Sequence, residues 1–303
     1  MLDLTLLSED QVFGDNQLDI LKKYGRSCIV TDFAILTEII KQNLYGKWWT
    51  KTPGKNGDIS FVNELGDNDF SFVDGYLVGI RPTFAYSSIK SNFSNEERKV
   101  FGIKEIEYGE YPRWAVDKEK SIILEELYND GNISETGKKY TTFFHDIDYD
   151  EDEVVKIVLR KKTHTEYEYD GKKYIRFVVD LDLDGAVFTD GRTIKNNEPY
   201  WIKVEPIKWL VDEKNDVALS KYIIVSGIPF DDKFIYRGDF KNTFIKKFMD
   251  KYLAKDIECS IIKDKLIKNI ENKSYDFDSI FEDAIKKMND INESEKPKIM
   301  TLK

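Results

Sequence analysis

The sequence predicts an α+β fold, in which short antiparallel strands form the body and separate helices flank it. Two regions, residues 58–86 and 164–225, consist of short strand-like runs that Gly-Asp and Asp-Gly turns divide. Other regions have apolar residues at helical spacing instead. Strands that are grouped in runs, without a regular alternation of strand and helix, are typical of α+β domains.

Capping residues and terminal glycines mark the predicted helices. Residues 8–11 match a capping box, in which the side chains of Ser8 and Gln11 each bond the other's backbone. Gly25 and Gly131 stand where two later helices would end. The predicted helices cover residues 15–25, 31–44, 117–131 and 242–257.

The clearest strand signal is an Asp-Gly pair at residues 170–171, which lies between two alternating runs. Asp-Gly between such runs favours a two-residue hairpin turn, because both turn residues need a positive φ. Further strands follow in residues 199–225, so we expect a meander of antiparallel strands in the middle of the chain.

Composition limits the function classes. With 303 residues, 41% of them hydrophobic, the chain can bury a sizeable core, and its net charge of −10 argues against nucleic acids and anionic membranes as partners. No apolar run reaches the ~18 residues of a membrane helix, and the N-terminus lacks a signal-peptide pattern, so we expect cytoplasmic synthesis. Cys28 and Cys259 form no CxxC pattern, which argues against a disulfide scaffold or a cysteine zinc site.

Trp48 and Trp49 are adjacent and precede a Thr-Pro turn. Neighbouring residues of a strand point to opposite faces, so both rings can be buried only if both faces are covered or the backbone kinks. We interpret the pair as structural anchors; the alternative is that one ring belongs to a binding surface.

Common catalytic signatures are absent from the sequence, including Gly-rich phosphate loops, GxSxG and HExxH. His164 alternates with Glu166 and Glu168, which places the three on one strand face. We interpret this as a solvated face. The alternative is an enzyme of unrecognised type, with a polar cleft around the strands of residues 163–190.

One segment has the spacing of a calcium loop. Asp180, Asp182, Asp184 and Asp190 surround Gly185 as in D-x-D-x-D-G, and carboxylate oxygens at this spacing suit Ca²⁺. Gly191 stands where the closing glutamate is expected, and the flanks resemble strands. A charged hairpin turn without metal is therefore the alternative, and we expect no other cofactor.

Four blocks of sequence occur in a distinctive order. They are EIEYGEYP, EPIKWLV, ALSKYII and NTFIKKFM, at residues 105–112, 205–211, 218–224 and 242–249. WWTKTP and GIRPTF precede them, at residues 48–53 and 79–84. The set resembles an uncharacterised domain family of bacteria and their phages, in which the last two blocks follow the other four. The chain therefore looks like a circular permutation of that family.

This resemblance implies a C-type-lectin-like fold, with mixed and antiparallel sheets and flanking helices, as is also used by formylglycine-generating enzymes and phage adhesins. We expect one domain over residues 1–258, in which the β-rich residues 113–200 have no counterpart in that family and form an insertion. The helical pattern and high charge of residues 259–303 predict a helical extension and tail. The resemblance also implies a buried structural Arg81. If the order is permuted, the strands near residues 78–85 and 103–108 should be antiparallel neighbours in one sheet.

The function that the resemblance implies is a non-enzymatic binding or assembly module of phage or prophage origin, located in a virion or directed at a host surface. Its partners would be a protein or glycan surface, another virion subunit or a second copy of the chain. The loops around the tryptophan turn would form the ligand face. The expected contact residues are Lys47, Lys51, Lys55, Asn56, Asp58, Asn68 and Asp69.

Overall fold

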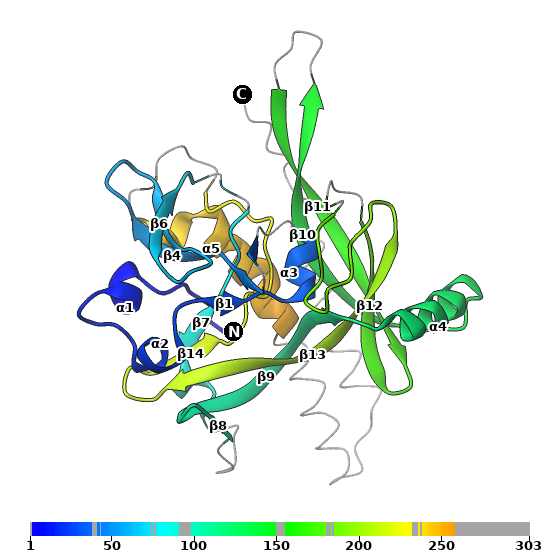
Figure 1. Cartoon of the computed structure of the whole chain (residues 1–303), viewed down its shortest axis with the longest axis horizontal. Helices are drawn as coiled ribbons and strands as arrows, with labels where there is room; N and C mark the ends of the chain where they lie inside the picture. Colours follow the sequence, from blue (N-terminus) through cyan, green and yellow to red (C-terminus); the bar gives the residue numbers. More distant parts are fainter. Residues whose placement is uncertain are drawn as a thin grey trace, which may run out of the picture. The chain divides into compact units, whose positions relative to one another are not determined.

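The computed structural model of the chain describes residues 2–37, 41–42, 44–73, 75, 77–90, 98–149, 155–179, 183, 185–231, 236 and 238–257. The strands in these ranges form three sheets with antiparallel pairing, and the helices lie around them (Figure 1). This arrangement confirms the predicted α+β class.

The helices are α1 (Glu9–Phe13), α2 (Asp19–Tyr24), α3 (Asp32–Leu36), α4 (Lys118–Asn129), α5 (Phe244–Phe248), the 3₁₀ turns η1 (Tyr86–Ser88) and η3 (Phe240–Asn242), and the π-helical turn η4 (Met249–Leu253). The strands are β1 (Cys28–Ile29), β2 (Lys41–Gln42), β3 (Tyr45–Gly46), β4 (Trp48–Pro53), β5 (Ile59–Val62), β6 (Asn68–Ser71), β7 (Thr83–Ala85), β8 (Arg98–Val100), β9 (Ile103–Ala115), β10 (Ser134–Tyr149), β11 (Val155–Tyr169), β12 (Lys172–Val178), β13 (Pro199–Asp212) and β14 (Val217–Ser220).

The large sheet is built around β13. Its strand order is β10-β11-β12-β13-β14-β7, and β9 pairs with β13 and with β8. Residues 202–204 of β13 pair with both β9 and β12, and residues 209–211 pair with both β9 and β14. Because a strand has only two edges, β12 and β14 share the edge of β13 opposite β9.

Two smaller sheets lie in the first third of the chain, with the orders β1-β3-β2 and β4-β5-β6. In the second of these, the turn between β4 and β5 is closed by a hydrogen bond from the Gly54 amide to the Asp58 carbonyl (2.8 Å). Trp48 of β4 also bridges Gly79, and Ile80 bridges Val225. The WWTKTP and GIRPTF segments therefore lie side by side.

Local signals predicted several element boundaries correctly. Ser8 and Gln11 form the capping box at α1, and Gly25 follows the last residue of α2. The hairpin of β11 and β12 turns at Asp170 and Gly171, whose φ angles of 53° and 64° are the positive values that this turn needs.

The helix predicted over residues 31–44 is wrong in its length, because α3 ends at Leu36. The hydroxyl of Ser226 donates to the carbonyls of Ala34 (2.8 Å) and Thr37 (2.5 Å), and the Ser226 amide donates to the Thr37 hydroxyl (2.9 Å). A segment distant in sequence thus takes carbonyls that a longer helix would use for itself. Residues 41–42 pair with β3 instead.

The strands expected to be neighbours, near residues 78–85 and 103–108, belong to one sheet and run antiparallel, but they are not adjacent. β14 and β13 lie between β7 and β9. The two strands still approach each other through side chains, since the rings of Phe84 and Tyr108 are 6.0 Å apart.

One face of the large sheet is covered by α3. The ring of Phe33 makes edge contacts with Tyr111 on β9, His164 on β11 and Phe177 on β12, at centroid distances of 5.6, 5.9 and 6.2 Å. Burial of these aromatic rings supplies much of the apolar area that stabilises the fold. The same packing buries His164, a polar residue on that face.

Candidate functional site

Trp48 and Trp49 are both fully buried, on opposite faces of the β4–β5–β6 sheet. The Trp48 ring lies under the guanidinium of Arg81, and its Nε1 donates to the Arg26 carbonyl (3.0 Å). The Trp49 ring packs on Phe230, with centroids 5.5 Å apart. Both faces are therefore covered, and the pair anchors the sheet as predicted. Arg81 is buried, as the resemblance implied.

The predicted contact residues lie on this sheet but at separate places. Lys55 and Asn56 are exposed in the turn between β4 and β5, and Asp58 ends that turn. Lys47 lies at the opposite end, where its Nζ is 4.0 Å from Glu64. The sheet thus separates the turn residues from Lys47 by the length of β4.

The other three predicted residues are strand positions. Lys51 is half-buried in β4, where desolvation lowers the pKa of its ammonium group. Asn68 accepts a hydrogen bond from the Ser60 hydroxyl (2.7 Å), and Asp69 accepts one from the Phe70 amide (2.8 Å). Asp69 is exposed on β6, next to the exposed Phe70.

Sequence reasoning missed the apolar side chains of the same surface. Leu65, Phe70 and Phe72 are exposed by 71%, 45% and 79%. The alternation Asp69-Phe70-Ser71-Phe72 places the two aromatic residues on one side of the strand. That alternation was the available signal, but it does not tell which of the two sides is covered by the fold.

β6 is also the last strand of its sheet. It pairs with β5 from Asn68 to Ser71 and with no other strand of the described chain. Its outer edge is therefore available to another strand, and exposed apolar residues on such an edge favour pairing. We call Leu65, β6 and Phe72 together the β6 surface.

Of the strand face of His164, Glu166 and Glu168, only Glu168 is exposed, so the interpretation as a solvated face is wrong for His164 and Glu166. His164 and Glu166 are exposed by only 3% and 2%, and the Phe33 ring of α3 packs against the imidazole. The imidazole stacks on Phe177 and its Nε2 shares a hydrogen bond with the Thr142 hydroxyl (2.8 Å). Burial lowers the pKa of His164 to about 3, so the ring is neutral at pH 7.

The carboxylate of Glu166 is committed to protein partners rather than to His164. It accepts hydrogen bonds from the hydroxyls of Tyr140 and Thr136, both at 2.6 Å. The enzyme hypothesis places a polar cleft around residues 163–190. His164 and Glu166, the polar residues expected in that cleft, are instead packed in the interior.

The calcium hypothesis rests mainly on Asp180, Asp182 and Asp184, which lie outside the described residues. The fourth residue, Asp190, bonds the Nε of Arg192 through its carboxylate (2.7 Å). The side chains that the structure describes include no group of three or more His, Cys, Asp or Glu that could hold a metal ion.

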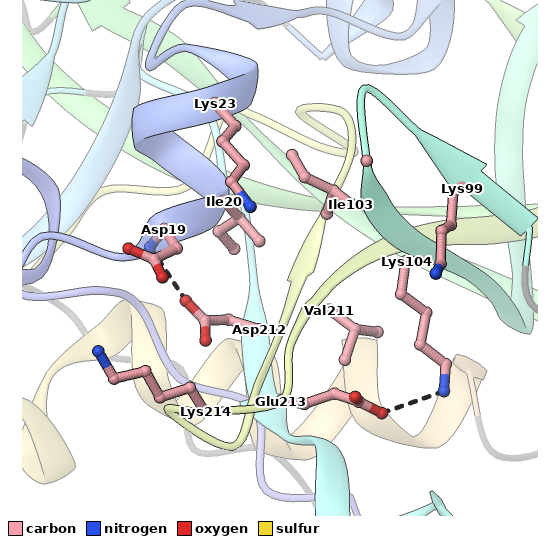
Figure 2. A pocket seen from close by; sticks show the side chains of 11 residues that line it. Asp19, Ile20, Lys23, Lys99, Ile103, Lys104, Val211, Asp212, Glu213 and Lys214 are labelled. Atoms are coloured by element: carbon pink, nitrogen blue, oxygen red, sulfur yellow. Dashed lines mark hydrogen bonds and ion pairs between the residues drawn. The ribbon is translucent and has the colours of Figure 1, made fainter.

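A recess lies beside the C-terminal end of β13 in the large sheet, and none of its lining residues belongs to the β6 surface. Figure 2 shows its lining from three segments: α2, the turn between β8 and β9, and the turn between β13 and β14. The recess has a volume of about 270 Å³, and four lysines line it: Lys23, Lys99, Lys104 and Lys214. No sequence motif indicated it, because its residues come from segments that are distant in the chain.

Within the described ranges, no helix is both long enough and apolar enough to span a membrane. Comparison of the chain with protein-family models, with curated proteins and with solved structures finds no match.

Proposed function

We propose that this chain is a non-enzymatic binding or assembly module, and that the β6 surface is where it contacts a protein partner. The observation that carries the proposal is the exposure of Phe70 on an edge strand and of Phe72 directly after it. Exposed aromatic residues on a strand edge are costly in water unless a partner covers them, and aromatic anchors are enriched in interfaces. The resemblance to a phage domain family with a C-type-lectin-like fold supports the same class of function.

Strand addition is the mode of contact that fits this geometry. An incoming strand would pair with the free edge of β6, and its side chains would pack against Phe70 and Phe72. Main-chain hydrogen bonds supply the affinity in this mode, and the alternate side chains supply the specificity.

The partner that the local charges favour is a second copy of the chain. Ile59 pairs with Ser71 and Val62 with Asn68, so the turn with Lys55 lies at the end of β6, and Asp67 lies at its start. Two β6 strands in antiparallel contact would bring each Lys55 toward the start of the other β6. Such a two-fold contact would place Lys55 of each copy near Asp67 of the other, so opposite charges would meet at both ends.

Light scattering after size-exclusion chromatography tests this proposal with three proteins. We expect the mass of the wild type to rise from monomer toward dimer between about 5 and about 500 µM, and the Phe70→Ser/Phe72→Ser variant to remain monomeric. Phe101→Ser is the matched control, because Phe101 is 78% exposed in a different turn. A wild type that stays monomeric, or a control that behaves as the double variant does, contradicts assembly through the β6 surface.

A further inference from the structure

The recess between α2 and the two turns has an apolar floor. Ile20, Ile103 and Val211 line it and are themselves exposed by only 2%, 4% and 5%. They come from α2, β9 and β13, so the floor is fixed by three separate elements. A floor of this kind can hold the apolar part of a small ligand without rearrangement.

The recess has three carboxylates, those of Asp19, Asp212 and Glu213, and each has a protein partner; that of Asp19 is the Nζ of Lys22, at 3.6 Å. Asp212 accepts hydrogen bonds from the backbone amides of Asp19 and Asn215, both at 3.1 Å (Figure 2). Glu213 pairs with the Nζ of Lys104 at 3.1 Å. Their negative charge is therefore partly neutralised before any ligand enters.

The ammonium groups are in a different situation. Lys23 and Lys214 line the recess, are exposed, and have no hydrogen-bond or ion-pair partner among the described residues. Lys99 and Lys104 also line the recess, but both have partners within the chain. The lining holds four lysines against three carboxylates, so it is positive by one charge in a chain with a net charge of −10.

We propose that this recess binds a small phosphomonoester, with its phosphate between Lys23 and Lys214 and its apolar body on the floor of Ile20, Ile103 and Val211. Lysine can bind phosphate, because its ammonium acts as a point charge with three rotatable donors. The volume of about 270 Å³ lies just below the range of pockets for drug-sized ligands, so the ligand has to be small.

This site is independent of the β6 surface, so either proposal can fail alone. The test titrates the full chain with phenyl phosphate, inorganic phosphate and phenol, and follows backbone amide signals by NMR. We expect phenyl phosphate to shift the signals of Gly102 and Ile103 and to saturate with a Kd of about 1 mM. Phenol and inorganic phosphate should each bind at least about tenfold more weakly, because each lacks one half of the recognised ligand.

Charge-removing variants locate the phosphate. Lys23→Gln and Lys214→Gln should each raise the Kd for phenyl phosphate about fivefold, and the double variant more. Lys172→Gln removes the same charge from an exposed position outside the recess and should leave the Kd within twofold. Absence of binding at about 20 mM, equal effects of all three substitutions, or equal affinity for inorganic phosphate would each overturn the proposal.

Discussion

The guanidinium of Arg81 lies 4.9 Å from the centre of the Trp48 ring, and neither side chain is exposed to solvent. The Nε of Arg81 donates to the Ser220 carbonyl (2.9 Å), whereas Nη1 and Nη2 have no hydrogen-bond partner among the described residues. Because arginine stays protonated, the ring face and one carbonyl stabilise a buried charge. This contact joins β4 to the segment that leads into β7.

We expect Arg81→Lys to lower the free energy of unfolding by about 2–4 kcal/mol, because lysine keeps the charge but loses the planar stacking and the aligned Nε donor. Arg81→Met should cost less, since it removes the buried charge at similar volume. Urea denaturation measures both. Arg192→Lys, at a partly exposed pair with Asp190, is the control and should change stability by less than about 1 kcal/mol. An Arg81→Met loss as large as that of Arg81→Lys would contradict this account.

Features that depend on a few neighbouring residues could be predicted from the sequence. The capping box of Ser8 and Gln11 and the hairpin turn at Asp170 and Gly171 follow from local backbone chemistry, and both are present. The end of α3 could not be predicted, because Ser226, nearly two hundred positions along the chain, determines it.

For the candidate sites too, local patterns could be predicted from the sequence and long-range contacts could not. Alternation correctly placed His164 and Glu166 on one strand face, but only the packing of Phe33 shows that this face is interior. Conversely, Phe70 and Phe72 stay exposed by 45% and 79%, although their pattern is that of a half-buried strand. Periodicity gives the faces of an element, and tertiary contacts decide which face is inside.

Asp32 connects three parts of the fold through one buried carboxylate. Its Oδ2 accepts the Ala115 amide (2.9 Å), and its Oδ1 accepts the amide and the hydroxyl of Thr189 (both 2.8 Å). Asp32→Ala would leave both amides without an acceptor, so we expect a loss of about 3–5 kcal/mol by urea denaturation. Thr189→Ala removes only the hydroxyl and should cost about 1 kcal/mol. Equal losses in the two variants would show that the amides find other acceptors.

His164 makes stability depend on pH in the acid range. Its pKa is about 3 in the folded chain, because burial disfavours the charged ring and Lys162 adds to this effect, against about 6.5 when unfolded. Below pH 6.5 the unfolded chain therefore binds the proton first, and stability falls as the pH falls toward 3.

His164→Gln removes this titration while it retains a group that can bond Thr142. The stability of the wild type relative to this variant should fall by on the order of 2 kcal/mol between pH 7.5 and pH 5. Denaturant titrations of both proteins at each pH measure the difference, in which the contributions of other groups cancel. Parallel stability curves for the two proteins would disprove the assignment.

Asp256 lies where α5 and η4 give way to the end of the described chain. Its Oδ2 is shielded from solvent and has no hydrogen-bond partner among the described residues, and its backbone carbonyl accepts the Nζ of Lys138 (2.7 Å). Burial raises the pKa of Asp256 to about 7; Lys138 opposes that shift and Glu166 adds to it. Tyr111 and Tyr140 belong to the same electrostatic neighbourhood, and the pKa of each hydroxyl is raised, mainly by burial.

The sign of the Asp256 effect is opposite to that of His164. Between pH 4 and 7 the folded chain holds a proton that the unfolded chain has released, so the contribution of Asp256 to stability falls as the pH rises through this range and is constant above it. Asp256→Asn keeps the main-chain bond to Lys138 and never ionises. We therefore expect this variant to exceed the wild type by a few kcal/mol at pH 8, with the difference shrinking toward pH 4. Urea denaturation across this range measures it, with Asp15→Asn, an exposed carboxamide substitution, as control. A difference that does not change with pH would mean that Asp256 remains ionised in the folded chain, paired with a group such as Lys138.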